Sequence, residues 1–546
     1  MFKLKNKKEK KKIKQEGFIH GVIALMFSQV LIKIFGLAYK WYLTNREGFG
    51  DQGNAIYSAG FSIYALLLTI SSTGVPNAVA KLVSENIAKE DYRSVHRIFK
   101  IAFITFAIIG LIGTFILFFG AKYIANNWLY IPEAEFSLVA LSPAIFFVSI
   151  SSVFRGYFNG IQNMKATANS QTLEQLFKTI VTIIIVEVAA ILSGINTNLM
   201  AAGANLATTI ATIGSFLYLY AFYKIRRKEL GRYIVSSKNN ETKSIFKTVK
   251  NILSVSIPMS LSSILTSINR NIDSTTVKRG LQAFLSESVS LKQYGILSGK
   301  IDILTTLPLS FNIAFATALV PSITIAKTKG DKKTIKNRIS FSLLITILIA
   351  LPCTIGIMIF AQQILDLLFP NAPEGAFILQ ISSLTIIFIA LEQTINGALQ
   401  GLGRIFTPAI ALLVGVCIKC ILNIILVPIP TIGTIGAAFG TLICHIVAFV
   451  IGFNSLIKNI KLEFKLINFV VKPILATSMM GICSYGVYLV TNGIVGEKMA
   501  TIISIIIAVL IYLLSIIVLK IFQKSEILML PYGDKVYKIL EKIKIY

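Results

Sequence analysis

Charged residues are scarce in this chain. Asp, Glu, Lys and Arg together make up 14% of its 546 residues, whereas 55% are hydrophobic, and the mean hydropathy is +0.74. Soluble proteins carry about 25% charged residues, so the composition predicts an all-α polytopic membrane protein. The net charge of +28 would also fit nucleic-acid binding, but lysines and arginines cluster between apolar runs, where membrane proteins carry cytoplasmic charge. We expect no nucleic-acid partner.

The residue types that catalysis uses are also few. The chain has three histidines and five cysteines, and it contains no Ser/His/Asp grouping, HExxH, P-loop or dinucleotide-binding motif. These absences exclude hydrolase and nucleotide-driven chemistry, so we expect neither an enzyme nor a cofactor. Cys417 and Cys420 have the CxxC spacing but lack a second ligand pair, and we interpret them as small buried thiols.

Long apolar runs dominate what is present. A helix needs about 20 apolar residues to cross a bilayer. The first run follows the basic stretch MFKLKNKKEKKKIKQEG; it is long, contains lysines and lacks a small-residue cleavage site, which favours a first span over a signal peptide. Fourteen spans are predicted at 17–43, 55–79, 99–126, 135–158, 167–193, 198–223, 246–272, 296–325, 337–361, 373–398, 405–428, 432–457, 467–492 and 499–522.

The charges between the spans predict the orientation. If the N-terminus is cytoplasmic, every second connection should be basic, and residues 81–100, 224–243, 326–338, 458–465 and the C-terminal tail are. We therefore expect a bacterial plasma-membrane protein with both termini in the cytoplasm.

An internal repeat organises the chain. The segment from Gly156 aligns without gaps on the segment from Gly397, and Gly160/Gly401 and Lys178/Lys419 coincide. Parallel six-span repeats are typical of secondary transporters that bind substrate between their halves, and the paired GxxxG spacings indicate close helix packing. The predicted parts are a basic tail (1–16), a six-helix lobe (17–224), a linker (225–245), a second six-helix lobe (246–457), two further spans (467–522) and a basic tail (523–546).

The stretch FSQVLIKIFGLAYKWYL (27–43) places polar residues along one face of the first span. Gln29, Lys33 and Lys40 are four and seven residues apart, which predicts a face directed at a cavity, because lipid disfavours charge. A second interpretation stays open, mainly for Lys40: its amine could extend to the outer interface.

Other spans also contain charges. Glu174 with Lys178, four residues apart, and Arg270 with Asp273, three apart, are expected to form structural or ion-coupling pairs. Lys300 and Asp302 lie in the eighth span. A central cavity built from spans one, seven and eight would therefore be basic and suit a phosphorylated, anionic substrate.

Several motifs carry a resemblance to a known family. FRGYFNGIQNMKATANSQTLEQ (154–175), NIAFATALVPSI (312–323) and the stretch LQGLGRIFTPAIALL from residue 399 resemble the polysaccharide-export branch of the MOP superfamily, in particular the group of stage V sporulation protein B and MurJ-type lipid II flippases. The resemblance implies two six-helix lobes in a V shape, alternating access and two extra helices for a polyprenyl tail. It also places Lys33 and Lys40 where the family has cavity-facing arginines.

These observations together predict a flippase for a polyprenyl-pyrophosphate-linked oligosaccharide, with lipid II as the expected substrate. Gln29, Lys33, Lys40, Arg270 and Lys300 would bind it. Membrane lipids and a monovalent cation are the other expected partners, since the membrane potential or an ion gradient would drive the cycle. The alternatives are export of another lipid-linked glycan such as a capsule or teichoic-acid unit, a cation-coupled multidrug exporter, and a glycan ligase or polymerase, which the short outer loops disfavour.

Overall fold

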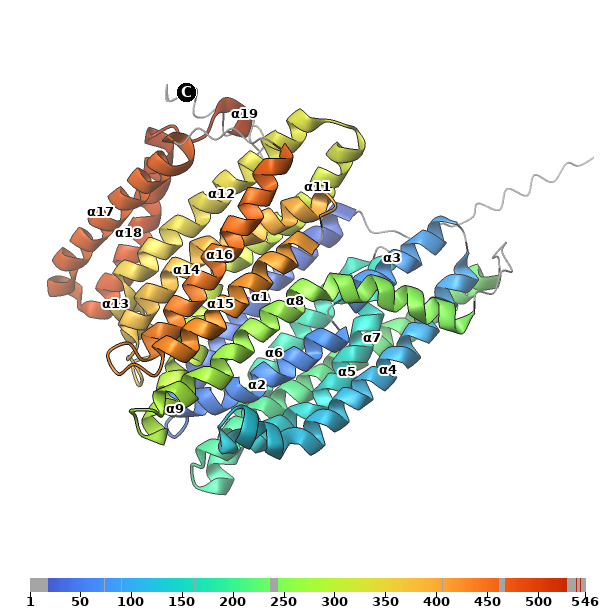
Figure 1. The fold of residues 1–546 in the computed structure, drawn as a ribbon, viewed down its shortest axis with the longest axis horizontal. Helices are drawn as coiled ribbons and strands as arrows, with labels where there is room; N and C mark the ends of the chain where they lie inside the picture. Colours follow the sequence, from blue (N-terminus) through green and yellow to red (C-terminus); the bar gives the residue numbers. More distant parts are fainter. Residues whose placement is uncertain are drawn as a thin grey trace, which may run out of the picture.

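The computed structural model is a bundle of long, roughly aligned helices (Figure 1). It describes residues 18–72, 74–89, 91–161, 163–235, 244–404, 406–460 and 467–527, together with positions 537 and 541. These ranges contain helices and turns and no strand, which confirms the all-α prediction for the described part of the chain. The predicted tail 1–16 and most of the tail 523–546 lie outside it.

The helices follow one another with short connections. The first half contains α1 (Phe18–Asn45), α2 (Gly50–Ser72), α3 (Val75–Ala88), α4 (Tyr92–Tyr123), the π-helix η1 (Ile124–Trp128), the 3-10 helix η2 (Pro132–Ala134), α5 (Glu135–Gly160), α6 (Met164–Ser193) and α7 (Thr197–Val235). The second half contains α8 (Ile245–Leu281), α9 (Glu287–Gly295), the π-helix η3 (Ile296–Ile301), α10 (Asp302–Thr306), α11 (Leu309–Thr328), α12 (Lys332–Ile359), α13 (Ala361–Leu368), α14 (Ala376–Gly401), α15 (Phe406–Leu426), α16 (Thr434–Ile460), the π-helix η4 (Ile467–Val471), α17 (Lys472–Val495), α18 (Glu497–Val518) and α19 (Lys524–Ile527).

Each predicted span overlaps one or more of these helices. Within the described residues, ten helical segments are long and apolar enough to cross a membrane, and they correspond to α4 with η1, η2 with α5, α6, α7, α12, α14, α15, α16, η4 with α17, and α18. The polytopic membrane fold is therefore confirmed, while the count of fourteen stays a prediction. The predicted span 296–325 is divided among η3, α10 and α11, and α7 continues to Val235, so the first part of the expected linker is helical.

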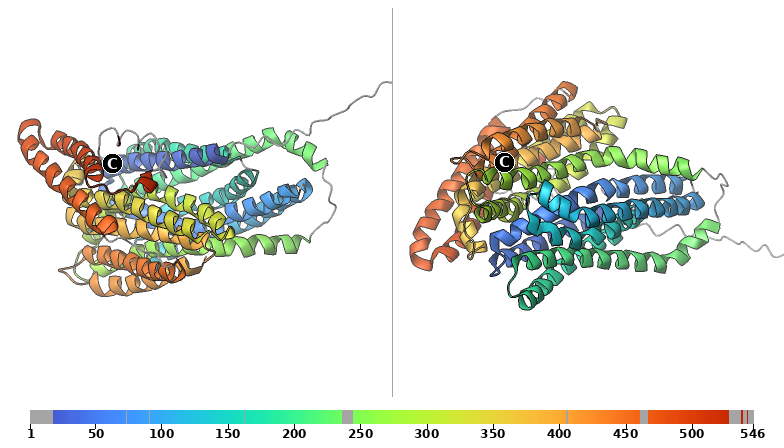
Figure 2. Two further views of the ribbon diagram at one scale, coloured as in Figure 1. Left: turned by 90° about the horizontal axis from the view of Figure 1, so that it is seen from above. Right: turned by 60° about the horizontal axis from the view of Figure 1, so that its bottom comes forward.

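Two groups of helices lie side by side, with α8 along their boundary (Figure 1). This helix contacts α2, α3 and α4 of the first half and α15 and α16 of the second. The last two spans, α17 and α18, pack on α12 and α13 at the edge of the second group (Figure 2). We call the end of the bundle where α1 turns into α2 the α1–α2 end, and the opposite one the α11–α12 end.

The helix starts support the internal repeat. Asp91 precedes α4 and accepts a hydrogen bond from the backbone N–H of Ser94 at 3.0 Å. Asp331 precedes α12 and accepts one from the N–H of Thr334, also at 3.0 Å. An aspartate in this position satisfies an N–H that the first helical turn leaves free, and here the same cap recurs at corresponding positions of the two halves.

The paired glycines pack helices closely, as predicted. A Cβ atom at Gly156 would lie 2.8 Å from the backbone oxygen of Pro76 on α3, and one at Gly397 would lie 2.6 Å from that of Ala316 on α11. Gly160 and Gly401 approach α3 and α11 in the same way. Because the missing side chains are what permit this approach, the glycines have a structural role in both halves.

Candidate functional site

Lys33 is a predicted site residue on which charges from other helices act electrostatically. It lies on α1 and is half-buried, and the charged groups acting on it are Arg270 of α8 and Asp302 of α10. The side chains of Arg270 and Asp302 are exposed. Since lipid disfavours exposed charge, we group these three residues as one candidate polar face. We call it the Lys33 face.

Lys40 lies seven residues further along α1, in a different environment. It is buried, and its Nζ donates to Asn54 Oδ1 at 3.0 Å and to Ser58 Oγ at 3.5 Å. The same ammonium lies 4.4 Å from the centre of the Tyr57 ring. A side chain held inside the protein in this way does not extend to the interface, so the snorkelling interpretation of Lys40 is wrong.

Lys178 of α6 is also buried, and its partners are aromatic. Its Nζ lies 4.4 Å from the centre of the Phe61 ring and 5.0 Å from that of Tyr39. A cation over aromatic faces is stabilised by their negative electrostatic potential. The side chain of Gln29, the remaining residue of the predicted polar face, lies outside the described residues.

The two expected ion pairs are formed with other partners. Glu174 pairs with Arg155 of α5, whose guanidinium is 2.6 Å from the carboxylate, and not with Lys178. Asp273 pairs with Lys419 of α15 at 2.6 Å, and not with Arg270. The predictions from i,i+4 and i,i+3 spacing were wrong, because in each case a cation from a neighbouring helix supplies the buried partner.

Lys300 does not join the Lys33 face. Its side chain is 0% exposed and its Nζ donates to Asp51 Oδ2 at 3.0 Å, with Asp51 1% exposed. It also donates to the backbone oxygens of Ala372 at 2.6 Å and Glu374 at 2.9 Å. This ion pair joins η3 of the second half to the start of α2 in the first, at the α1–α2 end.

Further contacts close the same end of the bundle. Asn371 Nδ2 donates to the backbone oxygen of Asn45 at 2.7 Å, and Lys278 Nζ donates to that of Tyr130 at 2.5 Å. A Cβ atom at Gly295 would lie 1.8 Å from the backbone oxygen of Asp51. With the Lys300 pair, these are the closing contacts, because each joins the two halves at the α1–α2 end.

One surface pair of the second half lies beside the closing contacts. Lys292 Nζ is 2.6 Å from Glu374 Oε1. The hydrogen bond from Lys292 holds the pKa of the Glu374 carboxyl below its ordinary value, and in return raises the pKa of Lys292. Both groups are therefore charged at neutral pH.

A second buried titratable pair lies in the second half. His445 Nδ1 of α16 is 2.7 Å from Glu392 Oε2 of α14. The sequence analysis named none of Glu392, His445, Arg155 and Asp51 as a site residue. For Arg155, the signal was its place in the first repeat segment, beside the paired glycines; nothing in the local sequence around Asp51 indicated a buried pair.

The cysteines form no metal site within the described ranges, which contain no group of three His, Cys, Asp or Glu able to hold a metal ion. Cys420 is partly buried, but Cys417 is exposed on α15. The expectation of buried thiols was therefore wrong for Cys417, which shares the apolar outer surface of α15 with exposed residues such as Leu413 and Ile421.

Comparison with known proteins assigns the chain to a family. The family model described as "Polysaccharide biosynthesis protein" matches residues 18–327. The chain belongs to this family. A second model, described as MatE, matches residues 294–425. Among the proteins compared below, the names of a lipid II flippase and of a multidrug resistance transporter state an activity, and in both it is transport.

Two curated relatives from Bacillus subtilis (strain 168) span most of the chain. Stage V sporulation protein B is 26% identical over 428 residues, covering 78% of this chain and 80% of the relative. Lipid II flippase MurJ is 26% identical over 480 residues, covering 85% of this chain and 87% of the relative.

Solved structures share the fold. Lipid II flippase MurJ in an inward closed conformation has a TM-score of 0.62 at 18% identity, covering 91% of this chain and 98% of that one. An inward-facing multidrug resistance MATE family transporter of the MOP superfamily has a TM-score of 0.65 at 16% identity, covering 82% and 98%. The MATE/MurJ-like fold implied by the sequence resemblance is confirmed.

Proposed function

We propose that this protein is a flippase that moves a polyprenyl-pyrophosphate-linked oligosaccharide across the bacterial plasma membrane, and that its substrate is the peptidoglycan precursor lipid II. The observation that carries the proposal is the Lys33 face, in which the charges of Arg270 on α8 and Asp302 on α10 act on Lys33 of α1. Its cations are available to a pyrophosphate, and the similarity to a lipid II flippase along 85% of the chain supports the choice of headgroup.

In this proposal, Lys33 and Arg270 neutralise the pyrophosphate while the prenyl chain stays in lipid. Lys40 and Lys178 are buried in the first half and would add positive potential to the Lys33 face. Neither has a carboxylate partner in an ion pair within the described part of the chain. Lysine gives charge without the bidentate geometry of arginine. A pyrophosphate could therefore bind Lys33 in more than one orientation. Asp302, exposed beside Lys33, is the acid that we assign to an accompanying monovalent cation.

The closing contacts define the proposed conformational cycle. With the N-terminus in the cytoplasm, the α1–α2 end faces outward, so the structure corresponds to a state closed to the outside. The basic stretch 326–338, which covers the end of α11, the short connection and the start of α12, then lies in the cytoplasm. Release of the headgroup outside requires the Asp51–Lys300 pair to separate, driven by the membrane potential or an ion gradient.

Complementation of a conditional lipid II flippase mutant tests this function. The wild-type chain should restore growth and lipid II translocation, and Lys33→Ala and Arg270→Ala should reduce translocation. Loss of one charged hydrogen bond to the pyrophosphate costs about 1.5–3 kcal/mol, or roughly 10- to 150-fold. Lys122→Ala, which removes an exposed charge from the last turn of α4, is the matched control and should behave as wild type.

A second substrate remains a candidate because the family description names polysaccharide biosynthesis in general. If depletion of the protein in its own host leaves lipid II translocation unchanged while another lipid-linked glycan accumulates inside, that glycan is the substrate.

A multidrug exporter is the third candidate, since the MatE model matches part of the chain. The positive potential of the Lys33 face repels cationic drugs, so drug efflux that survives Lys33→Ala would favour this alternative over both flippase functions.

A further inference from the structure

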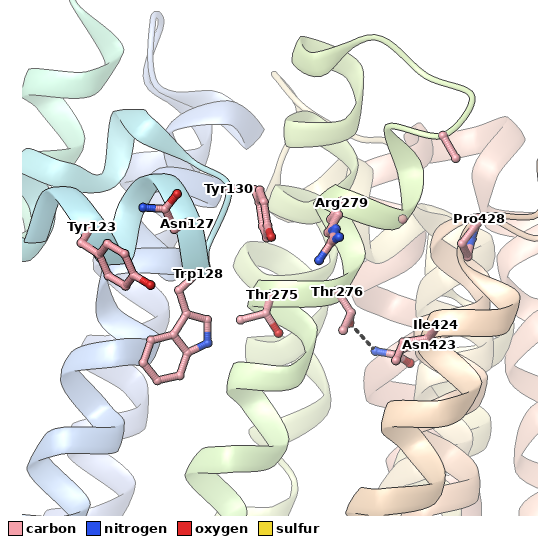
Figure 3. A pocket seen from close by; sticks show the side chains of 12 residues that line it. Tyr123, Asn127, Trp128, Tyr130, Thr275, Thr276, Arg279, Asn423, Ile424 and Pro428 are labelled. Atoms are coloured by element: carbon pink, nitrogen blue, oxygen red, sulfur yellow. Dashed lines mark hydrogen bonds between the residues drawn. The ribbon is translucent and has the colours of Figure 1, made fainter.

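A groove lies along α8, lined by residues of the first half, of α8 and of the α15 region (Figure 3). It has a volume of about 640 Å³, within the range of small-molecule sites, roughly 300–1,000 Å³. Tyr123 and Trp128 line it from the first half, Thr275 and Arg279 from α8, and Ile424 and Pro428 from the second half. We call it the Arg279 groove.

The groove opens to the membrane rather than to the protein interior. The helices on either side of α8 here, α4 and α15, have rows of exposed apolar side chains, of which Phe119 is 76% and Ile424 61% exposed. Trp128 and Tyr123 are exposed at the end of α4, where interfacial aromatic residues anchor membrane proteins. The groove therefore lies at the level of the lipid headgroups of the leaflet at the α1–α2 end.

The chemistry of the lining favours an anion. Arg279 is exposed, and its guanidinium lies 4.8 Å from the centre of the Tyr130 ring, which orients it. It makes no ion pair or hydrogen bond within the described part of the chain, and no acidic residue lines the groove. The indole N–H of Trp128 and the amide of Asn127 are further donors on the wall that the first half contributes (Figure 3).

We propose that the Arg279 groove binds an anionic phospholipid, with the phosphate on Arg279 and the acyl chains along the apolar surface of α15. Because the walls come from both halves, a lipid bound here joins them in the same way as the closing contacts do. It therefore favours the state closed at the α1–α2 end. This inference is independent of the identity of the transported substrate.

The two tryptophans of the chain provide the experiment. Trp41→Phe leaves Trp128, which lines the groove, and Trp128→Phe leaves Trp41, which is 50% exposed at the same end of the bundle on α1. Each variant is placed in phosphatidylcholine nanodiscs that contain a small fraction of brominated phosphatidylglycerol or brominated phosphatidylcholine. Bromine quenches tryptophan fluorescence at short range, so quenching reports local lipid composition.

We expect about fivefold enrichment of phosphatidylglycerol at Trp128, because one basic side chain near a membrane surface contributes about 1 kcal/mol of attraction to anionic lipid. We expect no enrichment at Trp41. Arg279→Gln should abolish the enrichment. The control Lys122→Gln removes a charge next to Tyr123 at the end of α4 but outside the groove, and it should preserve the enrichment. Equal quenching by the two lipids at Trp128, or enrichment that survives Arg279→Gln, would overturn the proposal. Displacement of phosphatidylglycerol by an equimolar amount of unlabelled polyprenyl pyrophosphate would overturn it too, by assigning the groove to the transported lipid.

Discussion

At the residue scale, the decisive distinction is between cations that are available and cations that are already paired. Lys33 is half-buried and Arg270 is exposed, whereas Lys300, also expected to bind substrate, is fully buried on Asp51. Sequence reasoning found all three because it looks for charge within apolar runs. It could not separate them, because the partner that buries Lys300 lies 249 residues away along the chain.

Variants of the Asp51–Lys300 pair should test this distinction. Lys300→Met and Asp51→Asn should each destabilise the protein strongly, because removal of one partner leaves a buried charge uncompensated at a cost of about 3–5 kcal/mol. The double variant should recover much of the loss. Thermal unfolding of the purified protein in detergent, with transport measured beside it, provides the readout. If Lys300→Met lost substrate binding at unchanged stability while Asp51→Asn had no effect, Lys300 would be a ligand after all.

At the element scale, the paired glycines were the most predictable feature. Gly156, Gly160, Gly397 and Gly401 pack where the repeat predicted, because a close helix approach needs a small residue at a fixed position and so leaves a direct sequence signal. The ion pairs of Glu174 and Asp273 were mispredicted, because in-helix spacing says nothing of which neighbouring helix supplies a closer cation. The division of the eighth span into η3, α10 and α11 was indicated only by the proline at 308 and the charges before it.

The closing contacts predict the effect of a cross-link between the halves. Cysteines at Asn45 and Asn371, introduced into a chain without its five native cysteines, should form a disulfide, since the two residues are hydrogen-bonded. The cross-link should hold the α1–α2 end closed and stop transport, and reductant should restore it. Each single-cysteine variant is the control. Full transport by the cross-linked protein would show that this end does not open during the cycle.

At the scale of the whole molecule, the two groups of helices, α8 along their boundary and the closed α1–α2 end form the arrangement expected of an alternating-access transporter (Figures 1 and 2). The fold class followed from composition and periodicity, and the family from a few glycine-rich motifs. The site followed only in part. The place of Lys33 on a substrate-binding polar face stays a prediction, and the influence of Arg270 and Asp302 on it depends on how α1, α8 and α10 are arranged.

The most direct test of the central claim is flipping of fluorescent lipid II by the purified protein in liposomes with an imposed membrane potential. Accessibility of the headgroup to a quencher outside measures the transfer. We expect potential-dependent flipping by the wild type and the Lys122→Ala control, near-wild-type flipping by Lys33→Arg, and a loss of roughly tenfold or more in Lys33→Ala and Arg270→Ala. Flipping by Lys33→Ala and Arg270→Ala at the wild-type rate would contradict the assignment of the Lys33 face as the site that carries the headgroup.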